Sequence, residues 1–141
     1  MPISKTPLSE LLGVDVSGVG CRTPPDVALR ADILSALHNH QVLVFRKQTL
    51  SKGERIAFSE AFGELEMHVN QADGGYERPK FHTVTNLDKN GNILPPLGKG
   101  RENNNTSTWH SDKSYMPCPS MPTFLHGIEV TREGEKRCLQ I

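Results

Sequence analysis

The segment Trp109-His110-Ser111-Asp112 places an imidazole and a carboxylate two residues apart. Alternation from Thr108 to Tyr115 predicts a β-strand, in which residues i and i+2 point to the same face. His110 and Asp112 would then be directed at one point. Two ligands of a 2-His-1-carboxylate iron site need that arrangement, which leaves coordination positions open. The alternative is structural: an imidazole hydrogen-bonded to a carboxylate at a strand end.

The other histidines have simpler interpretations. His38 and His40 lie at the expected end of a helix, where cationic side chains interact favourably with the helix dipole. His68 follows a helix-ending glycine, and by itself it is interpreted as a loop histidine. His82 falls in an expected strand as a satisfied sheet position. A strand-like pattern around His126 argues against a ligand pair on a helix.

Two helices are expected in the first half of the chain. Thr23 as a cap, followed by Pro24 in the first turn, predicts a helix over residues 24–38. Ser51 with Glu54 forms a capping-box pattern that begins the second helix, which Gly63 ends.

Strands are expected mostly later, where apolar or alternating runs are separated by turn residues. The expected strands are residues 14–20, 42–45, 81–85, 108–115 and 123–130, with a tight turn over 88–92 and a loop over 95–107. Helices early and strands late predict the α+β class, with a sheet-based core rather than βαβ units.

Composition limits the function classes. The chain has 141 residues, and its 16 Lys plus Arg balance 16 Asp plus Glu, so it lacks the basic excess of a nucleic-acid binder. No apolar run approaches the ~18 residues of a membrane span, and no secretory signal is evident. Three cysteines without a CxxC pair, Cys21, Cys118 and Cys138, suggest free thiols. We expect a single-domain cytoplasmic protein that binds neither nucleic acid nor membrane.

Several features follow one another in a fixed order. They are Gln41–Arg46, Phe62-Gly63-Glu64-Leu65, His68, Thr85-Asn86-Leu87-Asp88 and Thr108–Asp112. In this order they resemble the N-terminal half of the taurine dioxygenase (TauD/TfdA) family of Fe(II)/2-oxoglutarate-dependent dioxygenases. The resemblance runs from about residue 8 to residue 133. Residues 86–112 lean toward the branch that includes 2,4-dichlorophenoxyacetate dioxygenases.

The resemblance implies an incomplete double-stranded β-helix (jelly roll) with flanking N-terminal helices. It implies that His110 and Asp112 are the first two iron ligands. His68 resembles the family's histidine for the substrate anion. Asn105 or Thr106 falls where a polar residue lining the substrate is expected.

The implied cofactors are Fe(2+), 2-oxoglutarate as cosubstrate and O2. The implied reaction couples decarboxylation of 2-oxoglutarate to succinate with hydroxylation of a small anionic organic substrate, of the sulfonate or aryloxyalkanoate type. For the full-length family the resemblance also allows a homo-oligomer.

Residues 1–133 are expected to be the N-terminal part of such a domain, and residues 134–141 a divergent tail. The family's Gly-Gly-x-Thr turn is replaced by Gly134-Glu135-Lys136-Arg137. One base inserted in a permitted back-translation restores Gly-Gly-Lys-Thr, so a frame shift is one explanation and a genuine divergent C-terminus is the other. The family's distal histidine and its 2-oxoglutarate-binding arginine lie in its second half.

We therefore expect the isolated 141-residue chain to be inactive. The alternatives are a non-catalytic fragment and a module that binds small anions or another chain. A zinc hydrolase would need three protein ligands, and the sequence offers no strong third.

Overall fold

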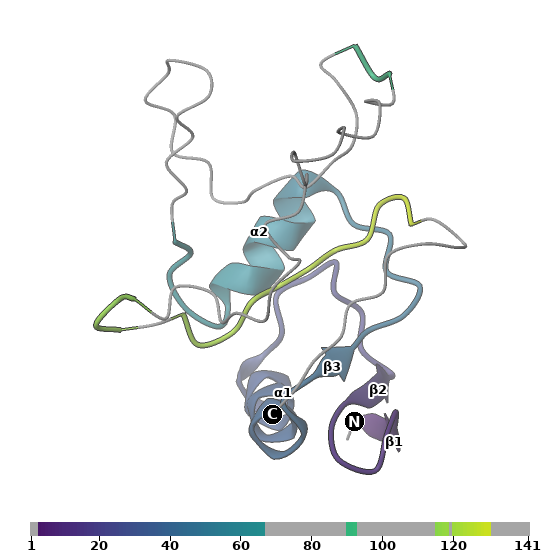
Figure 1. Ribbon diagram of the computed structural model, residues 1–141, viewed down its shortest axis with the longest axis vertical. Coiled ribbons are helices and arrows are strands. Elements are labelled where there is room, and N and C mark those ends of the chain that lie inside the picture. Colours follow the sequence, from purple (N-terminus) through teal and green to yellow (C-terminus); the bar gives the residue numbers. More distant parts are fainter. Residues whose placement is uncertain (1–2, 67–89, 93–114, 119, 131–141) are drawn as a thin grey trace, which may run out of the picture. The chain divides into compact units, whose positions relative to one another are not determined.

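The computed structural model describes residues 3–66, 90–92, 115–118 and 120–130 (Figure 1). The chain divides into two compact units, Met1–Thr85 and Asn86–Ile141. The described part of the first unit is a small mixed sheet with two helices. The described part of the second unit contains neither a helix nor a strand, so the expected jelly roll is not confirmed.

The sheet has three strands in the order β1-β2-β3, which are β1 (Ser4–Pro7), β2 (Val14–Ser17) and β3 (Leu43–Val44). β1 pairs antiparallel with β2, and β2 pairs parallel with β3. Parallel neighbours need a crossover connection, and here helix α1 (Val27–His40) lies between them in the chain. The prediction that excluded a βαβ unit is therefore wrong for this part of the fold.

Strand β1 was not predicted from the sequence. All four of its residues are exposed, so it has no apolar alternation to indicate a strand. Its pairing with β2 is closed by a turn in which the Leu8 N–H donates to the Gly13 carbonyl at 2.9 Å. Gly13 has a φ of 86°, a conformation that glycine adopts without the cost a side chain would add.

Helix α1 begins later than its prolines suggested. Asp26, not Thr23, is the N-cap, and its carboxylate accepts a hydrogen bond from the Leu29 N–H at 2.8 Å. The predicted start is wrong because Pro25 disfavours helical geometry at Pro24. The helix ends at His40, and the following Gln41 has a φ of 59° while its N–H donates to the Leu37 carbonyl.

The end of α1 is tied to the start of β2. The His40 carbonyl accepts from the Gly13 N–H, and the Val42 carbonyl accepts from the Val14 N–H, both at 2.9 Å. β3 then contains only Leu43 and Val44, both half-buried. The expected strand over residues 42–45 is present but shorter than predicted and less buried.

Helix α2 (Lys52–Glu60) confirms the predicted capping box. The Glu54 N–H donates to the Ser51 hydroxyl at 3.3 Å, and the Ser51 N–H donates to the Glu54 carboxylate at 2.7 Å. The helix ends at Glu60, before Gly63, whose N–H donates to the Glu60 carbonyl at 3.3 Å. The helix start was readable because both capping groups lie within one turn of sequence.

The hydrophobic core of the first unit lies between the sheet and the two helices. Its aromatic part is Phe58 of α2, with ring centroids 6.3 Å from Phe45 and 5.4 Å from Phe62. The buried cluster consists of Val14, Val16, Val19, Cys21, Ile33 and Phe58. Truncating a buried phenylalanine to alanine typically costs about 3–5 kcal/mol, so Phe58 should contribute strongly to the stability of the first unit.

In the second unit, residues 123–130 were predicted as a strand and form none. Tyr115, the last residue of the strand expected over 108–115, lies in a turn. A strand needs a neighbour for its hydrogen-bond ladder, and apolar composition alone does not provide one. Asn90 lies in a turn and Gly91 has a φ of 83°, which agrees with the expected turn over 88–92 where it is described. The expected strand over 81–85 and the loop over 95–107 lie outside the described residues.

Candidate functional site

The four predicted site residues are His68, Asn105, His110 and Asp112, and all four lie outside the described residues. Their roles therefore stay predictions. Among the described His, Cys, Asp and Glu side chains, no group of three could hold a metal ion. Neither described helix is long and apolar enough to cross a membrane.

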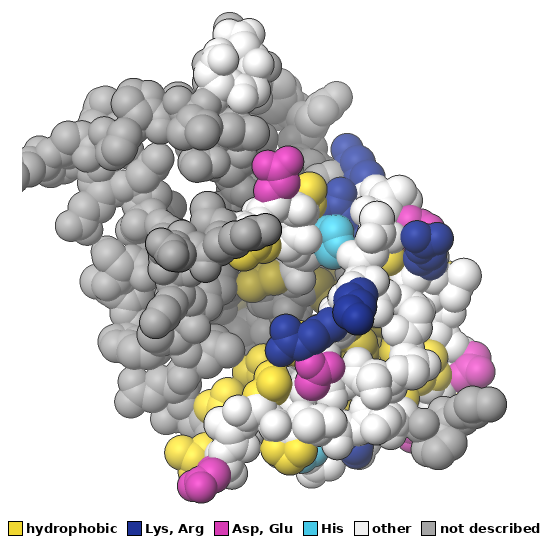
Figure 2. All heavy atoms as spheres, turned by 90° about the vertical axis from the view of Figure 1, so that its right-hand side faces the viewer, with side chains coloured by type: hydrophobic (Ala, Val, Ile, Leu, Met, Phe, Trp, Pro, Cys, Tyr) yellow, Lys and Arg dark blue, Asp and Glu magenta, His cyan; other side chains and the backbone are white. Residues whose placement is uncertain are grey.

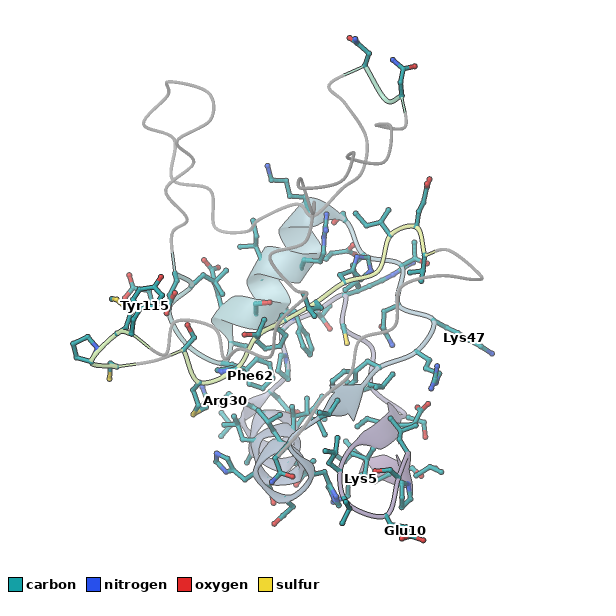
Figure 3. The ribbon with its side chains drawn as sticks, viewed as in Figure 1. Lys5, Glu10, Arg30, Lys47, Phe62 and Tyr115 are labelled. Carbon is teal, nitrogen blue, oxygen red and sulfur yellow. The ribbon has the colours of Figure 1, made fainter. Side chains whose placement is uncertain are left out.

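The segment that carries His68 begins at the end of α2, and this end is held in place. Arg30 of α1 donates from Nη1 to the Ala61 carbonyl at 3.3 Å, next to Phe62, whose ring packs on Phe58 (Figure 3). An arginine at the carboxyl end of a helix also complements the helix dipole. The chain thus proceeds toward His68 from a point fixed by both helices.

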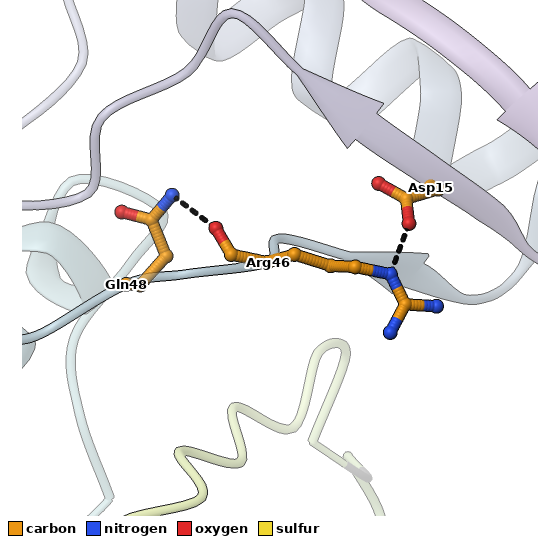
Figure 4. Close-up of polar contacts among 3 residues, drawn as sticks. All are labelled: Asp15, Arg46 and Gln48. Atoms are coloured by element: carbon orange, nitrogen blue, oxygen red, sulfur yellow. Dashed lines mark hydrogen bonds and ion pairs between the residues drawn. The ribbon is translucent and has the colours of Figure 1, made fainter.

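A polar cluster spans β2 and the segment that follows β3. The Arg46 guanidinium donates from Nε to the Asp15 carboxylate (Figure 4). Asp15 faces Val44 in the parallel register, which places Arg46 two residues further along. The Arg46 side chain is 62% exposed and that of Asp15 is 25% exposed, so solvent screening limits this pair to about 0–1 kcal/mol.

Gln48 is the most extensively hydrogen-bonded side chain of this cluster. Its Oε1 accepts from the Cys21 N–H at 3.0 Å, and its Nε2 donates to the Val19 and Arg46 carbonyls, each at 3.1 Å. Val19 and Cys21 are buried, so the glutamine satisfies backbone groups at two core residues. These contacts assign Gln48 a structural role.

The contacts of Gln48 could not be inferred from the sequence. A single glutamine after an expected strand resembles any solvent-exposed polar residue, and its partners are distant in the chain. A nearby contact also joins residues distant in the chain: Arg22 donates from Nε to the Thr49 carbonyl at 3.3 Å. Together they join the loop before α1 to the segment before α2.

Burial removes Cys21 from the candidate nucleophiles. It raises the pKa of the Cys21 thiol to about 11, so the thiol is protonated at neutral pH. The thiolate is the reactive and metal-binding form. Cys118 is also a free cysteine, and it is exposed. The expected free thiols are thus confirmed at these two positions, and Cys138 lies outside the described residues.

Glu54 is engaged in capping rather than in chemistry. The hydrogen bond from the Ser51 backbone lowers the pKa of its carboxyl group, and the Ser51 side chain adds to the effect. His38 and His40 occupy the last turn of α1, as predicted. On the face drawn in Figure 2, acidic and basic side chains are interspersed.

Comparison with known proteins matches the chain to one family. Residues 4–137 match the family model of "Taurine catabolism dioxygenase TauD, TfdA family". The chain is 26% identical over 138 residues to alpha-ketoglutarate-dependent 2,4-dichlorophenoxyacetate dioxygenase of Cupriavidus pinatubonensis, covering 95% of this chain and 48% of the relative. It is 25% identical over 138 residues to (S)-phenoxypropionate/alpha-ketoglutarate-dioxygenase of Delftia acidovorans, covering 94% of this chain and 44% of the relative.

Among solved structures, AAD-2 in complex with Mn(II) and N-oxalylglycine is similar with a TM-score of 0.62 and 28% identity. The match covers 84% of this chain and 39% of that chain. This chain therefore spans about half, or less, of the length of the relatives that it matches.

Proposed function

Because the chain belongs to the TauD/TfdA family of dioxygenases, we propose that it is part of an Fe(II)- and 2-oxoglutarate-dependent dioxygenase. The proposed reaction is hydroxylation of a small anionic substrate of the aryloxyalkanoate or sulfonate type. The family match over residues 4–137 is the observation that carries the proposal. The names of two relatives, which act with alpha-ketoglutarate on 2,4-dichlorophenoxyacetate and (S)-phenoxypropionate, support the aryloxyalkanoate class.

The donor chemistry of the predicted site fits the proposed metal. His110 and Asp112 would offer one imidazole and one carboxylate, the two ligand types of the non-haem iron oxygenases. The bound iron with 2-oxoglutarate would supply the oxidising chemistry. The protein would hold the ligands, orient the substrate and exclude water.

His68 and Asn105 are the proposed substrate-binding residues. An imidazole at His68 could donate a hydrogen bond to a carboxylate or sulfonate, and Asn105 would line the substrate. The role of His68 rests on its position after Phe62-Gly63-Glu64-Leu65, where the family resemblance places the histidine for the substrate anion. No catalytic acid or base is assigned.

We propose that the 141-residue chain alone does not turn over 2-oxoglutarate. Residues 1–133 would form the first part of the dioxygenase domain, and residues 134–141 a divergent tail. A site with two protein ligands should hold iron weakly, because metal affinity depends on the number of ligands that the fold provides.

The proposed location is the cytoplasm.

The test compares succinate formation by two proteins, the 141-residue chain and a longer protein in which a one-base insertion after codon 134 joins it to the downstream genomic sequence. Each is supplied with Fe(II), ascorbate, O2, 2-oxoglutarate and a panel of 2,4-dichlorophenoxyacetate, (S)-phenoxypropionate and taurine. We expect turnover only by the longer protein, abolished by His110→Ala or by Asp112→Ala. Robust turnover by the short chain, or a longer protein indifferent to both substitutions, would contradict the proposal.

A further inference from the structure

We draw no further inference here: the strongest candidate, the surface patch of exposed basic side chains Arg22, Arg46 and Lys47 along the segment between β3 and α2, carries none because Arg22 already donates to the Thr49 carbonyl and Arg46 to the Asp15 carboxylate, and nothing in the described residues shows what covers it.

Discussion

The side chain of Gln48 accepts a hydrogen bond from the backbone N–H of Cys21 at 3.0 Å, although 27 residues separate them in the chain. The same amide donates to the Val19 carbonyl. The side chain of Gln48 thus supplies the hydrogen bonds that the backbone of a neighbouring strand would supply if β2 were longer. The segment between β3 and α2 is held to the core by this contact, by the Arg22–Thr49 hydrogen bond and by packing of Phe45 and Leu50, rather than by further sheet.

Replacing Gln48 should be far more costly than its position in a connecting segment suggests. Gln48→Met keeps the volume of the side chain but removes three hydrogen bonds and leaves backbone groups of buried residues without them. We expect a loss of about 2–4 kcal/mol in the free energy of unfolding, measured by urea denaturation. The control Arg46→Ala removes an exposed ion pair and should cost about 1 kcal/mol or less. Equal losses for the two variants would refute the assigned role.

The capping box should make part of the stability depend on pH. Hydrogen bonds from Ser51 lower the pKa of Glu54 below its ordinary value of 4.5. A carboxyl group with a lowered folded-state pKa stabilises the fold above its unfolded pKa, and this stabilisation is lost as the pH falls through the folded pKa. Glu54→Gln should therefore lower the urea midpoint at neutral pH, with the difference from wild type shrinking below pH 4.5. The control is Glu10→Gln, at an exposed glutamate between β1 and β2. If Glu10→Gln changed the urea midpoint with the same pH dependence, the effect could not be assigned to the capping box.

The described cysteines should differ in reactivity. Burial raises the pKa of the Cys21 thiol to about 11, whereas Cys118 is exposed. In a Cys138→Ser protein at mildly alkaline pH, Ellman's reagent should modify Cys118 rapidly and Cys21 only after urea is added. Adding Cys118→Ser should remove the fast phase. A fast phase that survives this substitution would show that Cys21 is accessible in the folded protein.

The predicted ligands should be detectable in the short chain through weak metal binding. Binding of Mn(II) to the 141-residue chain should depend on both His110 and Asp112. It is measured by the loss of the electron paramagnetic resonance signal of free Mn(II). Alanine at either position should weaken binding at least about tenfold, the smallest effect usual for losing even an outer-sphere partner. His38→Ala, at an exposed histidine in the last turn of α1, should leave the affinity unchanged. Equal Mn(II) affinity of the wild type and the three variants would show that His110 and Asp112 are not metal ligands.

Sequence reasoning succeeded where the determining contacts are local. The capping box of Ser51 and Glu54 lies within one helical turn, and the structure confirms it. The family resemblance, carried by the order of short motifs, is confirmed by the match over residues 4–137. The capping box, and each single motif of that order, consists of residues close together in the chain.

Sequence reasoning failed where pairing between distant segments decides the outcome. β1 is a strand because β2 lies beside it, although its four residues are polar or proline. Residues 123–130 have the composition of a strand, but the described residues give them no place in a sheet. The contacts of Gln48 with Val19 and Cys21 could not be inferred from the sequence for the same reason. The roles of His68, Asn105, His110 and Asp112 stay predictions.

The position of the core in the chain has a consequence for biosynthesis. Every member of the described core cluster, with the side chains packed against it, lies between Ile3 and Phe62. The β1–β2 hairpin joins near neighbours in sequence, and α1 brings β3 back to β2 before α2 is reached. A nascent chain therefore carries all of these side chains while later codons are still being translated. The first unit can begin to collapse on the ribosome, ahead of the segments that contain the predicted iron ligands.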